Sequence, residues 1–148
     1  MATSTTDINN PNSKVISSVP VPIAASTQIV LYQHVSFNSS GYLVPSQDSA
    51  GLIPFGYSIT SAAQGNNTGA NGAITGNVVP YGVGDDNTYW VMATTGATQA
   101  WCGGKAYFLT DTTVAQTGGV SNNIEAGVVV QIYSSTSILV AMHPAYTR

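Results

Sequence analysis

The sequence predicts an all-β fold, and three observations carry that prediction. Apolar residues alternate with polar or small residues in several short segments, most clearly across residues 53–59, where every second residue is large and apolar. This period of two is typical of strands that bury one face. Clusters of Gly, Asn and Ser separate the segments at short intervals, and no stretch of ten residues shows the period and the caps of a helix. Many short strands with regular turns indicate a sandwich or barrel.

Taken in order, the pattern predicts eight strands from residue 28 onward, at residues 29–32, 42–44, 53–59, 78–81, 89–93, 106–109, 128–132 and 138–142. The last two strands are joined by a polar stretch that suits a hairpin loop. Residues 61–76 are rich in Gly, Asn and Ala and have little to bury, so we expect an exposed loop there.

Residues 1–26 differ in character from the rest of the chain. Prolines at positions 11, 20 and 22 disfavour a helix and an interior strand. We therefore expect an extended N-terminal arm over residues 1–26 and one β-barrel or β-tulip-like domain over residues 27–148. The apolar side chains of the arm are candidates for contact with another protein: Val15, Ile16, Val19, Val21 and Ile23. The alternative is a first edge strand that folds back on its own domain.

The charge content limits the partners. Only 6% of the 148 residues are charged, against roughly 25% in ordinary soluble domains, and just three are basic. Nucleic acid is an improbable partner because its affinity depends on Lys and Arg. A membrane is equally improbable, since no apolar run approaches the roughly 20 residues of a spanning helix. The polar start of the chain predicts no signal peptide, hence synthesis in a host cytoplasm.

The chain offers little for catalysis. His34 and His143 lie far apart in the sequence, and the single cysteine, Cys102, has no partner for a disulfide or a metal site. Residues 84–87 superficially resemble a calcium loop but lack its alternating ligands. No nucleophile elbow or phosphate-binding loop occurs. We expect no catalytic residue, no metal, no cofactor and no enzymatic activity.

Aromatic residues are the better indication of binding. Tyr89 and Trp90 are adjacent on a predicted strand, so their side chains point to opposite faces, and one of the two should be exposed or in an interface. Together with Trp101 they are candidate subunit-interface residues. The aromatic residues also suit a carbohydrate platform, and the alternative to both is burial in the core.

Four short motifs between Ser36 and Met142 resemble those of small tailed-phage capsid decoration proteins, also called cement or head-stabilising proteins. They are Gly-Tyr-Leu-Val-Pro at residues 41–45, Ile-Pro-Phe-Gly-Tyr-Ser at residues 53–58, Trp-Cys-Gly-Gly-Lys-Ala-Tyr at residues 101–107, and a Val-rich hairpin from Gly127 to Val140. Residues 61–76 look like an insertion relative to a compact member of that family.

The resemblance implies a viral structural protein on the outer surface of an icosahedral head. Such a protein is a homotrimer that contacts the major capsid protein, in part through an N-terminal arm, and cements neighbouring capsid subunits. It would be found on the virion. The alternative function is a carbohydrate- or surface-binding β-module of a phage tail fibre or adhesin.

Overall fold

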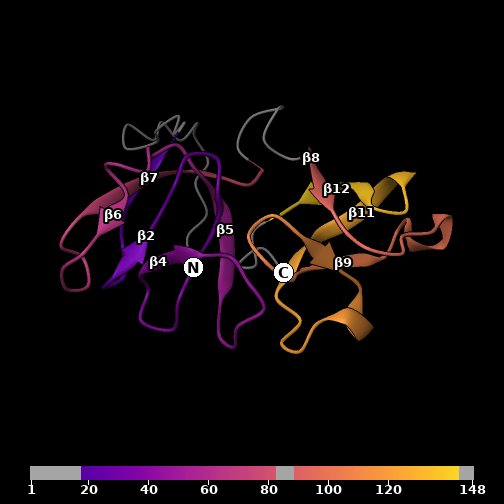
Figure 1. The fold of residues 1–148 in the computed structure, drawn as a ribbon, viewed down its shortest axis with the longest axis horizontal. Coiled ribbons are helices and arrows are strands. Elements are labelled where there is room, and N and C mark those ends of the chain that lie inside the picture. The colour runs from indigo at the N-terminus through magenta and orange to yellow at the C-terminus, as the bar shows by residue number, and fades with distance from the viewer. Residues whose placement is uncertain (1–17, 83–88, 144–148) are drawn as a thin grey trace, which may run out of the picture.

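The computed structural model describes residues 18–82 and 89–143, and the described chain is all-β, as predicted. It forms two lobes that lie side by side in Figure 1. The first lobe, residues 18–82, contains β1 (Val19–Pro22), β2 (Thr27–Gln28), β3 (His34–Phe37), β4 (Leu43–Pro45), β5 (Ile53–Ser58), β6 (Asn66–Asn67) and β7 (Thr75–Pro80). The second lobe, residues 89–143, contains β8 (Tyr89–Ala93), η1 (Gln99–Trp101), β9 (Lys105–Phe108), β10 (Val114–Ala115), η2 (Thr117–Gly119), β11 (Glu125–Ser134) and β12 (Ser137–Met142).

Each lobe is built on one five-stranded sheet that curls on itself. The first sheet has the order β1-β7-β5-β3-β4, and the second has the order β10-β9-β11-β12-β8, with antiparallel neighbours throughout. An isolated parallel bridge joins the outermost strands of each sheet, Ile23 to Leu43 in the first lobe and Ala93 to Thr113 in the second. Each sheet thus bends towards closure as a small barrel, and each encloses its own apolar core.

The two sheets have the same topology. The first sheet, read from β1, has its strands in the order first, fifth, fourth, second and third along the chain. The second sheet has the same order when it is read from β8. The registers also agree, because Val35 pairs with Gly56 in the first lobe and Ala106 pairs with Gly127 in the second. Equivalent positions are therefore 71 residues apart in the first four strands.

The fifth strands correspond at a smaller separation. Pro80 pairs with Gly56, and Met142 pairs with Gly127, so these equivalent positions are 62 residues apart. The connection between β5 and β7 is accordingly nine residues longer than the one between β11 and β12. The chain is an internal structural repeat with one long loop in its first copy.

A shared irregularity supports the equivalence. The pairing of β3 with β5 skips Phe55, and the pairing of β9 with β11 skips the equivalent Ala126, so both sheets have a bulge at one place. The glycine after each bulge lies against the backbone of the fifth strand. A Cβ on Gly56 would collide with the Val79 carbonyl, and a Cβ on Gly127 would collide with the Ala141 carbonyl. Only glycine permits this close approach.

The expected arm is wrong for residues 18–26. β1 pairs with β7 as an outermost strand of the first sheet, which is the edge-strand alternative. Val21 and Ile23 are 4% and 0% exposed and belong to the first core, so they are not available for contact with another protein, while Val19 packs against that core half-buried. Burying an aliphatic side chain stabilises a fold by about 1.5–3 kcal/mol, which favours folding back. Val15 and Ile16 lie outside the described residues.

Two further expectations need correction. The strand predicted at residues 29–32 is absent, because only Ile29 is buried and the chain turns at Leu31 and Tyr32. Residues 61–76 were expected to be an exposed loop, yet this segment contains β6, and Asn67 is 1% exposed. The side chain of Asn67 donates hydrogen bonds to the Ile23, Ala24 and Ala70 carbonyls, which explains its burial.

Candidate functional site: an apolar face of the second sheet

An aromatic cluster joins the two lobes. The imidazole of His34 in the first lobe lies 4.5 Å from the Trp90 ring and 5.7 Å from the Phe108 ring of the second, measured between centroids. Tyr57 also contacts Trp90, at 4.9 Å. Tyr81 is buried in the second core and shares a 2.5 Å hydrogen bond with Nδ1 of His34. The first lobe thus uses the outer side of its sheet to complete the core of the second.

Burial determines the protonation of this cluster. Desolvation lowers the pKa of His34 from 6.5 to about 4, against a smaller opposing effect of Asp111, so the imidazole is neutral at physiological pH. Burial likewise raises the pKa of Tyr81 well above its usual value, which keeps the phenol protonated. The indole Nε1 of Trp90 is buried without a hydrogen-bond partner among the described residues. The cluster is a neutral contact between the lobes.

Two polar contacts reinforce the junction. Gln33 donates a 2.7 Å hydrogen bond to Asp111. The exposed carboxylate of Asp48 accepts 2.7 Å hydrogen bonds from the backbone N–H groups of Ser121 and Asn122. These donors hold the pKa of Asp48 below its usual value, and the hydrogen bond from Ser121 makes the largest contribution. Both contacts orient one lobe on the other.

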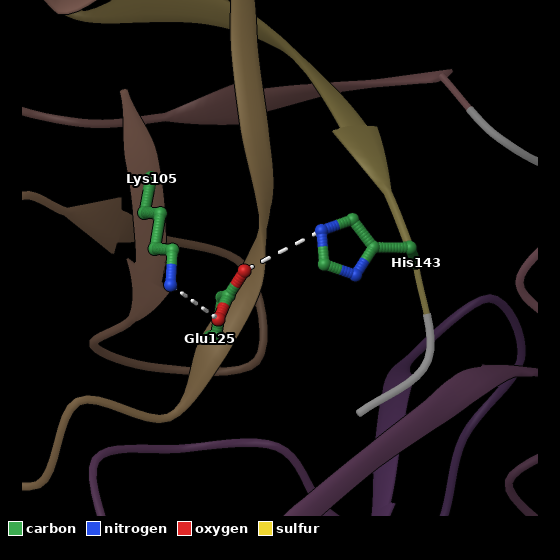
Figure 2. A network of polar contacts seen from close by, with 3 residues as sticks. All are labelled: Lys105, Glu125 and His143. Atoms are coloured by element: carbon green, nitrogen blue, oxygen red, sulfur yellow. Dashed lines mark ion pairs between the residues drawn. The ribbon is translucent and has the colours of Figure 1, made fainter. Parts of the chain in front are cut away.

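His143 belongs to a second polar cluster, shown in Figure 2. The carboxylate of Glu125, at the start of β11, lies 3.5 Å from Lys105 Nζ and 3.4 Å from His143 Nε2. The Glu125 side chain is 9% exposed, whereas those of Lys105 and His143 are 59% and 32% exposed. Nowhere in residues 18–82 and 89–143 do three or more His, Cys, Asp or Glu side chains gather closely enough to hold a metal ion.

The outer side of the second sheet carries an apolar surface. Two rows of cross-strand neighbours form it: Val128, Ala141 and Tyr89 in one, and Leu139 and Val91 in the other. The exposed Gln131, paired with Leu139 on β11, ends the second row. We call the five apolar residues the apolar face. Tyr89 and Val91, on the outermost strand β8, are 57% and 59% exposed, and the other three are half-buried. Lys105, paired with Val128, borders the face.

The first lobe shows that the fold does not require an apolar surface here. The positions equivalent to Val91 and Leu139 are Pro20 and Asn77, both exposed, and the position equivalent to Tyr89 is Ser18. The remaining two positions, Val128 and Ala141, correspond to Tyr57, which packs against Trp90, and to the buried Val79. The first lobe therefore lacks exposed apolar side chains only at the positions of Tyr89, Val91 and Leu139. Because exposed apolar surface is a liability for a monomer, its presence in the second lobe indicates a binding role.

The three candidate interface residues separate in the structure. Tyr89 lies in the apolar face, as its alternation with Trp90 allowed. Trp90 does not: it packs between the lobes, and its contacts are within the chain, because the first lobe covers its side of β8. Trp101, in η1, packs half-buried against the second core beside Cys102. Sequence reasoning missed Val91, although its two-residue spacing from Tyr89 places both on one side of a strand.

Comparisons with protein families, curated protein sequences and solved structures found no match to this chain. Among the described residues, no helix has the length and the apolar character needed to cross a bilayer.

Proposed function

We propose that this chain is a structural protein of a tailed-phage virion that binds the outer surface of the icosahedral head and cements neighbouring major capsid proteins. The observation that carries the proposal is the apolar face, whose most exposed residues, Tyr89 and Val91, correspond to Ser18 and Pro20 in the first lobe. The motifs that resemble decoration proteins also lie in the elements that build both sheets, namely β4, β5, η1 with β9, and the β11–β12 hairpin.

The chemistry of the apolar face suits a lasting protein contact. Its five residues bear no charge, and its only charged neighbour in the paired rows is Lys105. Protein interfaces concentrate aromatic and aliphatic groups at their centre and exclude charges, since an unpaired buried charge is costly. Nucleic acid would instead require several basic groups at this position.

The proposed mechanism is mechanical. Each bound copy would bury apolar surface across a seam between capsid subunits, so that opening the shell also breaks these contacts. Binding to the assembled shell alone stabilises that shell by mass action. Self-association into a homotrimer is part of the proposal, because several copies held together can contact the capsid subunits on both sides of a boundary.

A paired substitution tests the proposal. Val91→Asp should abolish attachment to heads that lack the protein, because it places a charge in the apolar face. Pro20→Asp, at the equivalent position of the first sheet, is the matched control and should attach normally. Thermal unfolding of both variants checks folding, and sedimentation with the heads measures attachment. Equal attachment of the two variants would contradict the assigned surface.

The abundance of the protein tests the function independently of the surface. Purified virions should contain it at a copy number comparable to that of the major capsid protein. A handful of copies per virion would favour a tail or fibre component. Complete absence would favour a binding module that acts outside the virion.

One observation favours the carbohydrate-binding alternative. Tyr32 is 61% exposed in a turn with a φ of 62°, and its ring lies 6.5 Å from that of Tyr57. A non-glycine residue in this conformation is uncommon and is often functional. If the protein binds host polysaccharide, Tyr32→Ala should remove the binding measured by calorimetry, and Tyr133→Ala, which removes a similarly exposed ring of the second lobe, should not.

A further inference from the structure

A cavity of about 280 Å³ opens where the second sheet comes closest to closing. It lies between the end of β8 and β10, beside the Ala93–Thr113 bridge. The lining residues are Ala93, Thr94, Thr95, Leu109, Thr113, Val114, Ala115 and Gly119. None of them is charged, so the cavity suits a neutral occupant.

The first lobe has the same seam, meaning the line along which the two outermost strands of its sheet meet. There, a segment of the first lobe itself covers the seam. The positions equivalent to Ala93 and Thr113 are Pro22 and Tyr42. Gly72, from the long β5–β7 connection, lies directly over these two residues. A Cβ on Gly72 would be 3.4 Å from Tyr42 Cε1 and 3.6 Å from Pro22 Cβ. The place of the cavity is therefore occupied in the first lobe.

Hydrogen bonds hold this covering segment, residues 67–74, along the end of β1. The Gly72 N–H donates to the Ile23 carbonyl at 2.9 Å, and the Ala25 N–H donates to Asn71 Oδ1 at 2.7 Å. The Asn67 amide donates to two carbonyls of the same stretch. An uncharged, asparagine-rich extended segment thus satisfies the backbone at this seam.

The second lobe lacks the covering segment. Its β11–β12 connection is nine residues shorter and turns directly between Ser134 and Ser137. The Thr94 N–H still pairs with the Thr136 carbonyl, as the Ile23 N–H pairs with the Ile74 carbonyl in the first lobe. The backbone hydrogen bond at the seam is thus alike in the two lobes. The second lobe differs because it lacks a covering segment and because Ala93 and Thr113 are smaller than their equivalents, Pro22 and Tyr42.

We propose that residues 1–17 occupy this cavity, as residues 67–74 occupy the equivalent place in the first lobe. Part of their composition matches, because residues 8–13 (Ile-Asn-Asn-Pro-Asn-Ser), between Asp7 and Lys14, are uncharged and rich in asparagine, with one proline and one large apolar side chain. The covering segment has the same character, with two asparagines at positions 67 and 71 and one large apolar side chain, Ile74.

The other segments outside the described residues fit less well. Residues 83–88 contain two aspartates, which an uncharged cavity disfavours. Residues 144–148 follow His143, six positions along β12 from Ser137, the partner of Ala93. That separation is about 20 Å at strand spacing, whereas five extended residues reach at most about 18 Å. Seventeen residues reach roughly 55 Å, enough to cross to the second lobe or to a neighbouring copy.

Photo-crosslinking of the full chain tests the occupant. Leu109 lines the cavity and is 43% exposed, so Leu109→p-benzoylphenylalanine places the reactive group at the rim without filling the interior. Mass spectrometry should find cross-links from position 109 to residues 1–17. Val130, at 42% exposure and outside the cavity, provides the matched control and should give none. Absence of cross-links to residues 1–17 from position 109 would overturn the proposal.

A substitution taken from the first lobe provides the second test. Thr113→Tyr installs the side chain of Tyr42 at the equivalent position and should reduce the cross-link yield from position 109 at least about tenfold. Ala115→Phe fills the cavity from β10 and serves if Thr113→Tyr fails to fold, as judged by thermal unfolding. An unchanged yield in a folded, filled variant would show that residues 1–17 bind elsewhere. This proposal concerns the chain itself and stands whether or not the protein attaches to a capsid.

Discussion

The two lobes place very different side chains at equivalent positions of one sheet surface. In the first lobe, His34, Tyr57 and Tyr81 meet the second lobe and are buried or half-buried. The equivalent positions of the second lobe carry Lys105, Val128 and His143, and no part of the described chain covers Lys105, which is 59% exposed. The same backbone therefore accepts a neutral aromatic cluster where it is covered and an ion-pair cluster where it is open. The topology of the sheet therefore determines where these side chains lie, and the presence or absence of a covering lobe determines whether they are neutral or charged.

The largest expected effect tests whether the two lobes are equivalent at all. Gly56→Ala and Gly127→Ala should each destabilise the protein by about 4 kcal/mol or more, because the new Cβ meets the carbonyl of the fifth strand. Gly118→Ala, which meets nothing within 4 Å, should change the free energy of unfolding by less than about 0.5 kcal/mol. Urea unfolding measures all three. Tolerance of only one of the first two substitutions would break the equivalence.

A reciprocal exchange sharpens the contrast between covered and open positions. His34→Lys should cost roughly 3–5 kcal/mol, because it leaves an uncompensated charge in the junction. Lys105→His, the opposite exchange, should cost less than about 0.5 kcal/mol, since the ion pair of an exposed lysine contributes little. Similar costs for the two exchanges, measured by urea unfolding, would show that covering by the second lobe does not determine the chemistry of the position.

The smallest expected effect appears only on acidification. The unfolded chain protonates His34 near pH 6.5, whereas the folded chain does so only near pH 4, so stability is retained above pH 6.5 and is lost as pH falls towards 4. The full loss amounts to about 3 kcal/mol. His34→Gln should flatten the dependence of unfolding free energy on pH between 6.5 and 4. An unchanged slope in His34→Gln would contradict a buried, neutral histidine.

The sequence predicted the strands that alternate cleanly and failed where local pattern does not decide. Residues 53–59, 89–93 and 138–142 form strands close to the expected bounds, because period-two alternation reflects one buried face. The arm failed because residues 18–26 read equally as an extended segment and as an edge strand. Only the pairing of β1 with β7, across more than fifty residues, separates the two.

The repeat was not predictable by eye from the sequence. Over residues 34–59 and their equivalents, only three positions are identical: Phe37 and Phe108, Ile53 and Ile124, and Gly56 and Gly127. The glycine pair is the informative signal, since its role depends on backbone contact and not on packing chemistry. The candidate site was half predictable. Alternation placed Tyr89 and Trp90 on opposite faces, but which face stays open depends on how the first lobe docks.

The contact between the lobes determines whether a further lobe could be added to the molecule in the same way. The contact is head-to-tail, because the two lobes use different surfaces to make it. His34 and Tyr57 of the first lobe contact Trp90 and Phe108 of the second. The first-lobe equivalents of Trp90 and Phe108 are Val19 and Phe37, which belong to another surface of the first lobe. Contacts of this type propagate into open filaments unless something ends them. The next lobe in such a row would have to desolvate Lys105 and the Glu125 carboxylate. The cost of removing water from these charges therefore opposes the addition of a third lobe at this surface.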